Sequence, residues 1–431
     1  MTVLVGLLVA VVLIALLAVV HRYLWRRLVR DVSAPGGWWR RVGTVLAYVL
    51  PVLSLGAFVT RQAGTPFVVQ QALAWPGYLW MALLLYLLLA LWAGELVRLA
   101  LRRVEARRDA RVAAPEPEPE PASVPAGADA ETSSDAPAPD APAVPDAPAD
   151  PGPRVEDPAR RLFVARTLAV GATGVAAVTV GAGAYSVLNG PTVKRLTVPL
   201  AKLPRRAHGY RIAVVSDIHL GPVLGRSHCR RVVDTINRTQ PDLVAIVGDL
   251  VDGEVDDLGH AAAPLADLES RHGSFFVTGN HEYFGDADAW LDHLRGLGVH
   301  PLENARRELP GFDLAGVNDV QGEAEGDGPD FDKALGDRDT SRASVLLAHQ
   351  PVQIHDAVDH GVDLQLSGHT HGGQLWPGNY LAELANPTVA GLERYGDTQL
   401  YVSRGAGAFG PPVRVGAESD VTVVTLASKQ A

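Results

Sequence analysis

Eight side chains that can bind metal ions or move protons follow short apolar runs in the C-terminal half of this chain. The runs read RIAVVSDIH, PDLVAIVGD, SFFVTGNH, SVLLAHQ and VDLQLSGHTH. The polar residues at their ends are Asp217, His219, Asp249, Asn280, His281, His349, His369 and His371. Carboxylates, amide oxygens and imidazoles are ligands of divalent metals, and gathering them away from water would be costly without a cation. The pattern therefore predicts a metal centre.

Two pairs among these residues are separated by a single position. Asp217 and His219 form the first pair, and His369 and His371 form the second. On an extended chain, side chains at i and i+2 point to the same side. The second pair could then reach two ions about 3.5 to 4 Å apart, the spacing of dinuclear sites. Glycines on both sides of this pair let the backbone approach without a side-chain clash.

The apolar runs have the character of buried strands. Each is too short for a free-standing helix, and most are rich in β-branched or aromatic residues. The stretches RSHCRRVVDTINRTQ and DADAWLDHLRGLG between them have helical spacing. This alternation predicts an α/β domain over 195–431, in which ligands bind beyond the carboxyl ends of the strands. Such a sheet would bring the polar residues to one edge.

Long apolar runs in the N-terminal part predict a membrane domain. The runs are Val3–Val20, Val42–Val59, Tyr78–Val97 and Thr167–Thr192. A run of about 18 residues, rising about 1.5 Å per residue, crosses most of a hydrocarbon core. A cleaved signal peptide is disfavoured because arginines follow the first run and none precedes it. We expect three membrane spans within 1–104 and a fourth within 159–190.

Arginines alternate between the loops that join these spans. Six follow the first span and six follow the third, whereas the loop after the second holds only Arg61. The positive-inside rule then places both arginine-rich loops in the cytoplasm and the C-terminal domain outside it. Against this, Lys194, Arg195, Lys202, Arg205 and Arg206 follow the fourth span and would have to cross the membrane. We expect a multi-pass protein of the cell membrane with an extracytoplasmic C-terminal domain.

A segment rich in proline, alanine and acidic residues lies between the third and fourth spans. Proline removes backbone donors and acidic residues repel one another, so 105–158 is predicted to be a disordered linker. A binding motif in its Glu-Pro repeat is the less favoured reading. The sequence RRLFVART that follows is similar to a twin-arginine export signal, but its internal position departs from the usual one. Two arginines that mark the cytoplasmic end of a helix are an equally good explanation.

Composition excludes several classes of function. The net charge of -10 provides no basic surface for a phosphate backbone, so we predict no nucleic-acid partner. The single cysteine, Cys229, allows neither an internal disulfide nor a zinc-thiolate site. The 47% of hydrophobic residues suits a globular domain with membrane segments.

The motifs DIH, GD, GNHE, a lone histidine and GHTH occur in that order over 155 residues. This set resembles the calcineurin-like metallophosphoesterase superfamily. GNHEYF, PLEN, LAGVND and LSGHTHGGQ are similar to its membrane-anchored bacterial phosphohydrolase branch. The resemblance begins near Pro199 and implies a four-layer α/β/β/α metallophosphoesterase sandwich, here preceded by transmembrane helices. It also implies a metal-dependent phosphoric ester hydrolase that acts on phosphomonoesters or phosphodiesters.

The resemblance implies a role for each residue of the site. The ligands implied for the first metal are Asp217, His219 and His371, those for the second are Asn280, His349 and His369, and Asp249 would bridge the two. Two divalent ions, Mn²⁺, Fe or Zn²⁺, would lower the pKa of a bridging water from about 15.7 towards 7 and neutralise the phosphoryl oxygens. His281 resembles the histidine that meets the phosphate or protonates the leaving group.

Several other residues have alternative explanations. Glu282 could orient a metal ligand or be a solvated turn residue, and Arg404 is a weaker candidate for contacting substrate phosphate. GAGAFG matches a dinucleotide-binding pattern, but two prolines follow it where a helix is required. The remaining histidines are expected at the surface, and they are His228, His260, His272, His293, His300, His355 and His360.

Three classes of function remain open. A membrane-anchored phosphoesterase is favoured, and its attachment to the lipid bilayer suggests lipid-linked or envelope phosphates as substrates. A non-catalytic metal-binding scaffold could dispense with His281, which is present. A transporter or sensor would need buried ionisable residues in the spans, and apart from Glu95 near an end the spans lack them.

Overall fold

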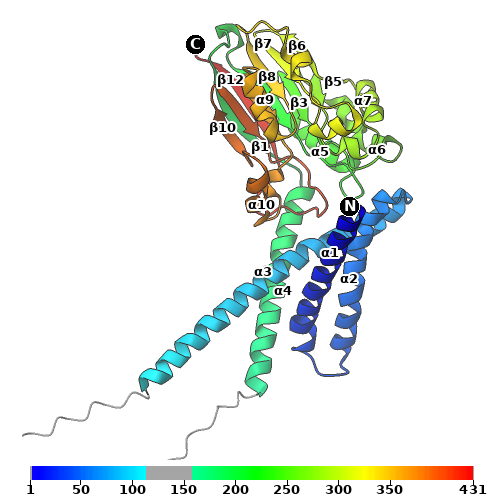
Figure 1. Cartoon of the computed structure of the whole chain (residues 1–431), viewed down its shortest axis with the longest axis vertical. Coiled ribbons are helices and arrows are strands. Elements are labelled where there is room, and N and C mark those ends of the chain that lie inside the picture. Colours follow the sequence, from blue (N-terminus) through cyan, green and yellow to red (C-terminus); the bar gives the residue numbers. More distant parts are fainter. Residues whose placement is uncertain (1, 113–157, 431) are drawn as a thin grey trace, which may run out of the picture.

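The computed structural model describes residues 2–112 and 158–430, which form a bundle of long helices and a separate layered domain (Figure 1). The long helices are α1 (Thr2–Trp25), α2 (Trp38–Gln62), α3 (Phe67–Val112) and α4 (Pro158–Leu188). A π-helical turn, η1 (Arg26–Arg30), continues α1. Figure 1 shows the N-terminus and the α2–α3 connection on the side of the layered domain, and the α1–α2 connection on the opposite side.

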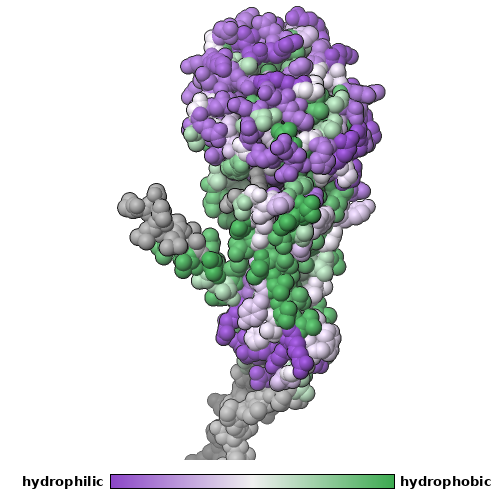
Figure 2. Space-filling view, turned by 90° about the vertical axis from the view of Figure 1, so that its right-hand side faces the viewer, coloured by the Kyte–Doolittle hydropathy of each residue, from purple (hydrophilic) through white to green (hydrophobic). Residues whose placement is uncertain are grey.

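Three helices of the described residues are long and apolar enough to cross a membrane: Trp38–Thr60, Phe67–Val104 and Ala159–Leu188. They contain the second, third and fourth predicted spans, except that the fourth ends at Leu188 because a strand begins at Thr192. The first predicted span lies in helix α1, and its crossing of the membrane stays a prediction. Figure 2 shows the hydrophobic belt of the helices between the polar layered domain and a polar end.

The first residues of the predicted linker over 105–158 are helical, and the linker itself stays a prediction. Helix α3 continues to Val112, through LRRVEARRDARV, because alanine, leucine and arginine are good helix formers. Residues 113–157 lie outside the described part of the chain. Arg160 and Arg161 lie in the first turn of α4.

Two six-stranded mixed sheets form the layered domain. The first has the order β1-β12-β2-β3-β4-β5 and the second β10-β11-β9-β8-β7-β6. The strands of the first sheet are β1 (Thr192–Leu200), β2 (Tyr210–Val215), β3 (Leu243–Val247), β4 (Ser274–Val277), β5 (Val299–Pro301) and β12 (Asp420–Ser428). Those of the second are β6 (Ala305–Leu309), β7 (Phe312–Gly316), β8 (Ala343–Leu347), β9 (Leu364–Ser367), β10 (Gly391–Tyr395) and β11 (Thr398–Val402). The five strands predicted from the apolar runs are β2, β3, β4, β8 and β9.

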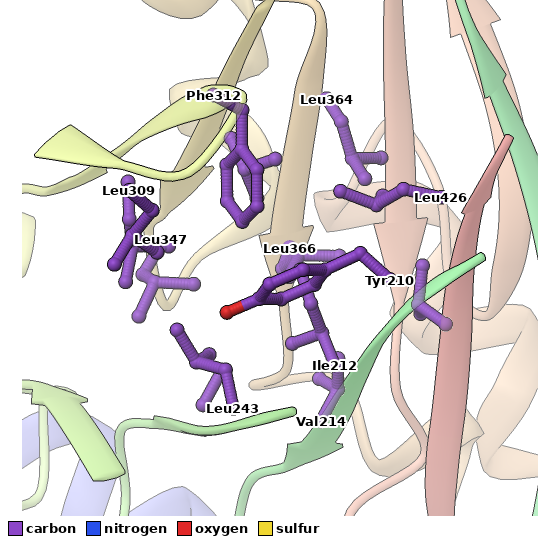
Figure 3. Packing of buried hydrophobic residues seen from close by; sticks show 14 of the residues in the cluster. Tyr210, Ile212, Val214, Leu243, Leu309, Phe312, Leu347, Leu364, Leu366 and Leu426 are labelled. Atoms are coloured by element: carbon purple, nitrogen blue, oxygen red, sulfur yellow. The ribbon is translucent and has the colours of Figure 1, made fainter. Parts of the chain in front are cut away.

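The sheets pack face to face with helices outside, as predicted. Alternation along β2 shows the arrangement, because Ile212 and Val214 face the core between the sheets while Ala213 and Val215 face the outer helices. Tyr210 and Phe312 fill the inter-sheet core (Figure 3), with ring centroids 5.0 Å apart. Helices α5 (Arg226–Asn237), α6 (Val255–Ala262) and α7 (Ala287–Gly296) cover the first sheet, and α8 (Phe331–Leu335) and α9 (Ile354–Asp359) cover the second. The fold is therefore the expected four-layer α/β/β/α sandwich.

The prediction that the unassigned histidines lie at the surface is wrong for His228. Its side chain is 1% exposed within helix α5, and neither ring nitrogen has a hydrogen-bond partner among the described residues. His228 lies four residues before buried Val232, on the same side of the helix, and therefore faces the core. Burial, followed by the charges of Arg231 and Arg414, lowers the pKa of His228 to about 3, so the ring is neutral.

Candidate metal centre

Parallel strands position the eight predicted residues at one edge of the sandwich. β2, β3 and β4 run parallel to one another in the first sheet, as do β8 and β9 in the second. Each strand ends two or three residues before its first polar residue of the set. The carboxyl ends therefore converge, and the structure brings all eight residues together at the edge where the sheets meet.

The backbone at this edge departs from the extended geometry predicted for the two pairs. Asp217 and His219 have φ of 51° and 48°, and His369 and His371 have φ of 72° and 52°. Asp249 has φ of 52°. Left-handed conformations are uncommon for residues other than glycine and cluster at functional sites. Each pair thus converges through tight turns and not through the pleat of a strand.

Two glycines allow the turns to come close, as predicted for the second pair. A Cβ on Gly368 would lie 2.4 Å from Oδ2 of Asp217. A Cβ on Gly248, where φ is +76°, would lie 2.5 Å from Nδ1 of His349. Any larger residue would therefore push a candidate ligand out of place.

Three residues from the two sheets form the first potential metal group: Asp217, His219 and His371. Nε2 of His371 lies 3.4 Å from Oδ1 of Asp217 and 3.0 Å from Nε2 of His219. All three side chains are buried. This is the set that the resemblance implies for the first metal, and its role stays a prediction.

A second group contains Asp249, His349 and His369. Oδ2 of Asp249 lies 3.2 Å from Nε2 of His349 and 3.8 Å from Nε2 of His219, which places this carboxylate between the two groups. Oδ1 of Asn280 lies 3.0 Å from Nδ1 of His369. The positions of Asn280 beside the second group and of Asp249 between the groups fit the ligand sets that the resemblance implies.

The chemistry of the donor set fits two cations. Nδ1 of His349 lies 2.8 Å from the carbonyl oxygen of Val247 and donates to it, which leaves Nε2 facing the site. That Nε2 is buried without a hydrogen bond to any described residue. A buried imidazole nitrogen that lies 3.2 Å from a carboxylate oxygen, without a well-formed hydrogen bond, is suited to metal ligation once its proton is released.

The ionisation of the candidate ligands is divided. Burial raises the pKa of Asp217, and although burial opposes it, neighbouring carboxylates raise the pKa of His219 to about 9 and hold that of His349 well above its usual range.

The other three charged or imidazole ligands are held in the form that binds metals. Burial, followed by the charge of His349, lowers the pKa of His369 to about 4, and burial with neighbouring His219 and Arg414 holds the pKa of His371 well below its usual range. Burial opposes ionisation of Asp249, but His349, His281 and His219 together hold its pKa well below the ordinary value. Neutral imidazoles and an ionised carboxylate are the forms that bind metals.

Asp252, which the motifs did not single out, lies beneath His281 and His219. Its Oδ1 lies 2.6 Å from Nδ1 of His281 and 3.2 Å from Nδ1 of His219. Although burial opposes it, contact with His219 and His281 holds the pKa of Asp252 far below its usual range. A carboxylate on Nδ1 fixes the ring and leaves Nε2 facing the site. The sequence signal was a second aspartate three residues after Asp249, before a glycine.

Glu282 orients the loops that carry two candidate ligands, and the alternative of a solvated turn residue is wrong. Its side chain is 1% exposed. Oε2 accepts hydrogen bonds from the backbone N–H groups of Gly279 at 2.6 Å and Asp249 at 3.1 Å. Oε1 accepts from those of Leu250 at 2.8 Å and Val251 at 3.4 Å. Burial, followed by the charge of Asp249, raises the pKa of Glu282 to about 8, although hydrogen bonds from the backbone N–H groups favour the ionised form.

Arg414 supports His371 through hydrogen bonds and was not identified from the sequence. Its guanidinium is 3% exposed, donates to the carbonyl oxygens of Gly407, His371 and Ala417, and lies 3.1 Å from Nδ1 of His371. The same residue's N–H donates at 3.3 Å to the carbonyl oxygen of Gly183 in helix α4. Arg414 therefore links helix α4 to the candidate metal ligand His371.

The weaker candidates have distinct positions. Arg404 is half-buried, and a Cβ on Gly372 would lie 3.0 Å from its Cγ, so its side chain borders the turn of His371. GAGAFG forms a loop without a helix after it, as expected from its prolines. Ala406 and Gly407 of this loop donate to the carbonyl oxygens of Ser216 and Asp217. These two hydrogen bonds hold the loop against the turn that carries Asp217.

Comparison with known proteins shows that this chain is similar to metallophosphoesterases. The family model described as calcineurin-like phosphoesterase matches residues 210–373. The "Uncharacterized metallophosphoesterase" of Aquifex aeolicus is 36% identical over 254 residues, which cover 57% of this chain and 97% of that protein. A Helicobacter pylori J99 protein with the same description is 39% identical over 250 residues, covering 57% of this chain and 67% of that protein.

An animal protein is also similar. The "Transmembrane protein with metallophosphoesterase domain" of Danio rerio is 39% identical over 259 residues, which cover 56% of this chain and 59% of that protein. The matched part of this chain thus spans about three fifths of that relative's length. Relatives of this kind occur in animals as well as bacteria, a wider range than the bacterial branch that the motifs resemble.

Proposed function

Because this chain belongs to the calcineurin-like metallophosphoesterase family, we propose that it is a membrane-anchored hydrolase of phosphoesters with a dinuclear metal centre. The observation that carries the proposal is the convergence of carboxylates and imidazoles from five strands into one buried cluster, in which Nε2 of His349 lacks a hydrogen bond to any described residue. When bound, two divalent cations supply an activated water and positive charge for the phosphoryl group. Mn²⁺ is the ion that we favour for the assay.

The residues around these cations would have different roles. The first metal would lie among Asp217, His219 and His371. The second would lie among Asn280, His349 and His369, and Asp249 would face both. Asp252 and Glu282 fix the histidine rings and the loops, so the ligands are ordered before substrate arrives.

His281 is the residue that we assign to proton transfer. Its Nδ1 is held by Asp252, and its Nε2 lies 4.0 Å from Oδ2 of Asp249, at the margin of the cluster. The side chain is 7% exposed and packs against the rings of Phe284 and Phe409, whose centroids lie 5.0 and 4.8 Å away. From this position Nε2 can donate a proton to the leaving oxygen of a phosphoester.

The membrane anchor suggests where the enzyme works. The arginines of η1 lie at the end of the helix bundle away from the layered domain, and Figure 1 shows the N-terminus and the α2–α3 connection at the other end. This arrangement supports an extracytoplasmic catalytic domain and lipid-linked or envelope phosphates as substrates. A reporter that is active only outside the cytoplasm, fused to Ala431, should be active; silence would place the domain inside.

A hydrolysis assay with a matched pair of variants tests the proposal. Purified full-length protein with Mn²⁺ should cleave bis(p-nitrophenyl) phosphate or p-nitrophenyl phosphate. His281→Asn should lower kcat by about 10² to 10⁴ while metal content is kept. The control is His300→Asn, because His300 is exposed. Bound metal without turnover of any phosphoester would favour the non-catalytic scaffold.

A further inference from the structure

Helix α10 (Gly378–Ala385) carries an apolar face that the layered domain does not cover. It follows the turn of His371 directly, and none of its residues is buried. Trp376 is 49% exposed, Tyr380 58%, Leu381 71% and Leu384 85%. Tyr380, Leu381 and Leu384 share one side of the helix because their spacing matches its period. Contiguous exposed apolar side chains of this kind mark an interaction surface.

The start of α10 is held against the membrane helices. The hydroxyl of Tyr86 in α3 donates to the carbonyl oxygen of Trp376 at 3.0 Å. Leu375, one residue earlier, packs with Val413 against a cluster formed by α3 and α4. In Figure 1, α10 lies beside the upper end of α4, level with the upper ends of α1 and α2. The apolar face is therefore continuous with the end of the membrane-spanning bundle.

We propose that the apolar face of α10 lies in the interfacial layer of the bilayer and holds the metal-centre edge of the domain on the membrane surface. A tryptophan and a tyrosine beside two leucines match the composition of membrane interfaces, where amphipathic rings lie at the headgroups and aliphatic chains enter the acyl boundary. The contacts of Leu375 and Trp376 with α3 and α4 already hold the start of α10 at this depth.

A narrow pocket also connects the site to the membrane helices. It is lined by His219, Asp252 and Phe409 of the domain together with Ala57 of α2 and Tyr78 of α3. The metal centre thus borders two membrane helices through this pocket, and α10 follows directly on the turn of its candidate ligand His371. If the proposed function holds, a phosphoester whose tail is embedded in the bilayer is the substrate class that this geometry favours over a soluble one.

A depth measurement tests the membrane contact without any reference to activity. Full-length Leu384→Cys is labelled with a nitrobenzoxadiazole probe and placed in liposomes of phosphatidylcholine and phosphatidylglycerol. Glu383→Cys is the matched control, because the exposed Glu383 lies about 100° around the helix from Leu384. Asp337→Cys, whose side chain is 82% exposed in the native protein, controls for a solvent position. Native Cys229 adds little background, since its thiol is buried and burial raises its pKa to about 12.

The outcomes separate the possible occupants of the apolar face. Doxyl-labelled lipid should quench the Leu384 probe at least about twofold more than the Glu383 and Asp337 probes, because an interfacial helix buries its apolar side by about 5 to 10 Å. Equal quenching at the three sites would overturn the proposal. A Leu384 probe that is shielded from water but not quenched, with shielding lost on dilution in lipid, would instead assign the face to a second copy of the chain.

A second experiment tests the consequence for substrate. Leu381→Asp/Leu384→Asp should lower hydrolysis of a phosphate lipid in vesicles about tenfold and leave hydrolysis of bis(p-nitrophenyl) phosphate unchanged. An equal effect on both substrates would contradict the consequence. If the wild type hydrolyses neither, the proposed function fails, whereas the quenching result still decides the membrane contact.

Discussion

Replacing Glu282 with glutamine exchanges one carboxylate oxygen for an amide nitrogen and should disorganise the metal centre. Each carboxylate oxygen accepts two backbone N–H groups, so an amide nitrogen in place of either oxygen faces two donors. The amide will turn towards Leu250 and Val251, because the bond from Val251, at 3.4 Å, is the weakest of the four. Two buried N–H groups then lose their acceptor.

The expected magnitude follows from those two groups. A buried donor without an acceptor costs about 1–3 kcal/mol, and the weak bond of Val251 puts the sum at about 2–4 kcal/mol of unfolding free energy. The loops that Glu282 joins carry Asp249 and Asn280, so metal affinity should also fall by about 10- to 100-fold. Both effects exceed those of a typical surface substitution.

Two assays measure the effect of Glu282→Gln. Denaturant unfolding of the metal-free protein in detergent gives the loss of stability, measured near pH 9 because the pKa of Glu282 is about 8 and the side chain is then a carboxylate. Competition with a chelator at the same pH gives the metal affinity. Glu269→Gln makes the same chemical change on an exposed side chain and serves as the control. If the two variants unfold alike and bind metal with equal affinity, the argument that Glu282 organises the site is refuted.

Three further variants test separate contacts. His228→Leu should lose less stability than wild type between pH 7 and pH 5. The pKa of His228 is about 3 in the folded protein and near 6.5 in the unfolded chain, so the unfolded chain takes up the proton first and wild type loses about 2 kcal/mol at pH 5. A variant at exposed His300 should keep the pH dependence of wild type. Asp252→Asn should lower kcat by about 10- to 100-fold with both metals retained; unchanged kcat would remove Asp252 from the positioning of His281. Arg414→Lys should weaken metal binding by about 10-fold or more, because lysine cannot donate to three carbonyl oxygens in the same geometry; wild-type affinity would contradict this role.

The strands and the order of the site could be predicted because each depends on local sequence. A short β-branched run followed by a polar residue predicts a buried strand, and parallel strands bring their carboxyl ends together wherever they lie in the chain. The conformation of the turns could not be predicted in this way. Asp217 and His371 have positive φ although neither is glycine, and no local pattern in the sequence indicates this.

The supporting residues were harder to predict than the ligands. Glu282 could be read as a solvated residue, because only the folded loops surround it with four N–H groups. Asp252 and Arg414 act on histidines 29 or more positions away in sequence, so no local pattern connects them. The depth at which His228 lies and the exposed face of α10 likewise depend on how whole elements pack.

Metal content of the purified protein tests the central claim most directly. Full-length protein equilibrated with Mn²⁺, Fe or Zn²⁺ and freed of excess ion should hold two ions per chain by elemental analysis. Asp249→Ala should hold fewer than one, since it removes the carboxylate between the two groups. A well-folded wild type without stoichiometric metal, or an Asp249→Ala variant that still holds two ions, would contradict the account.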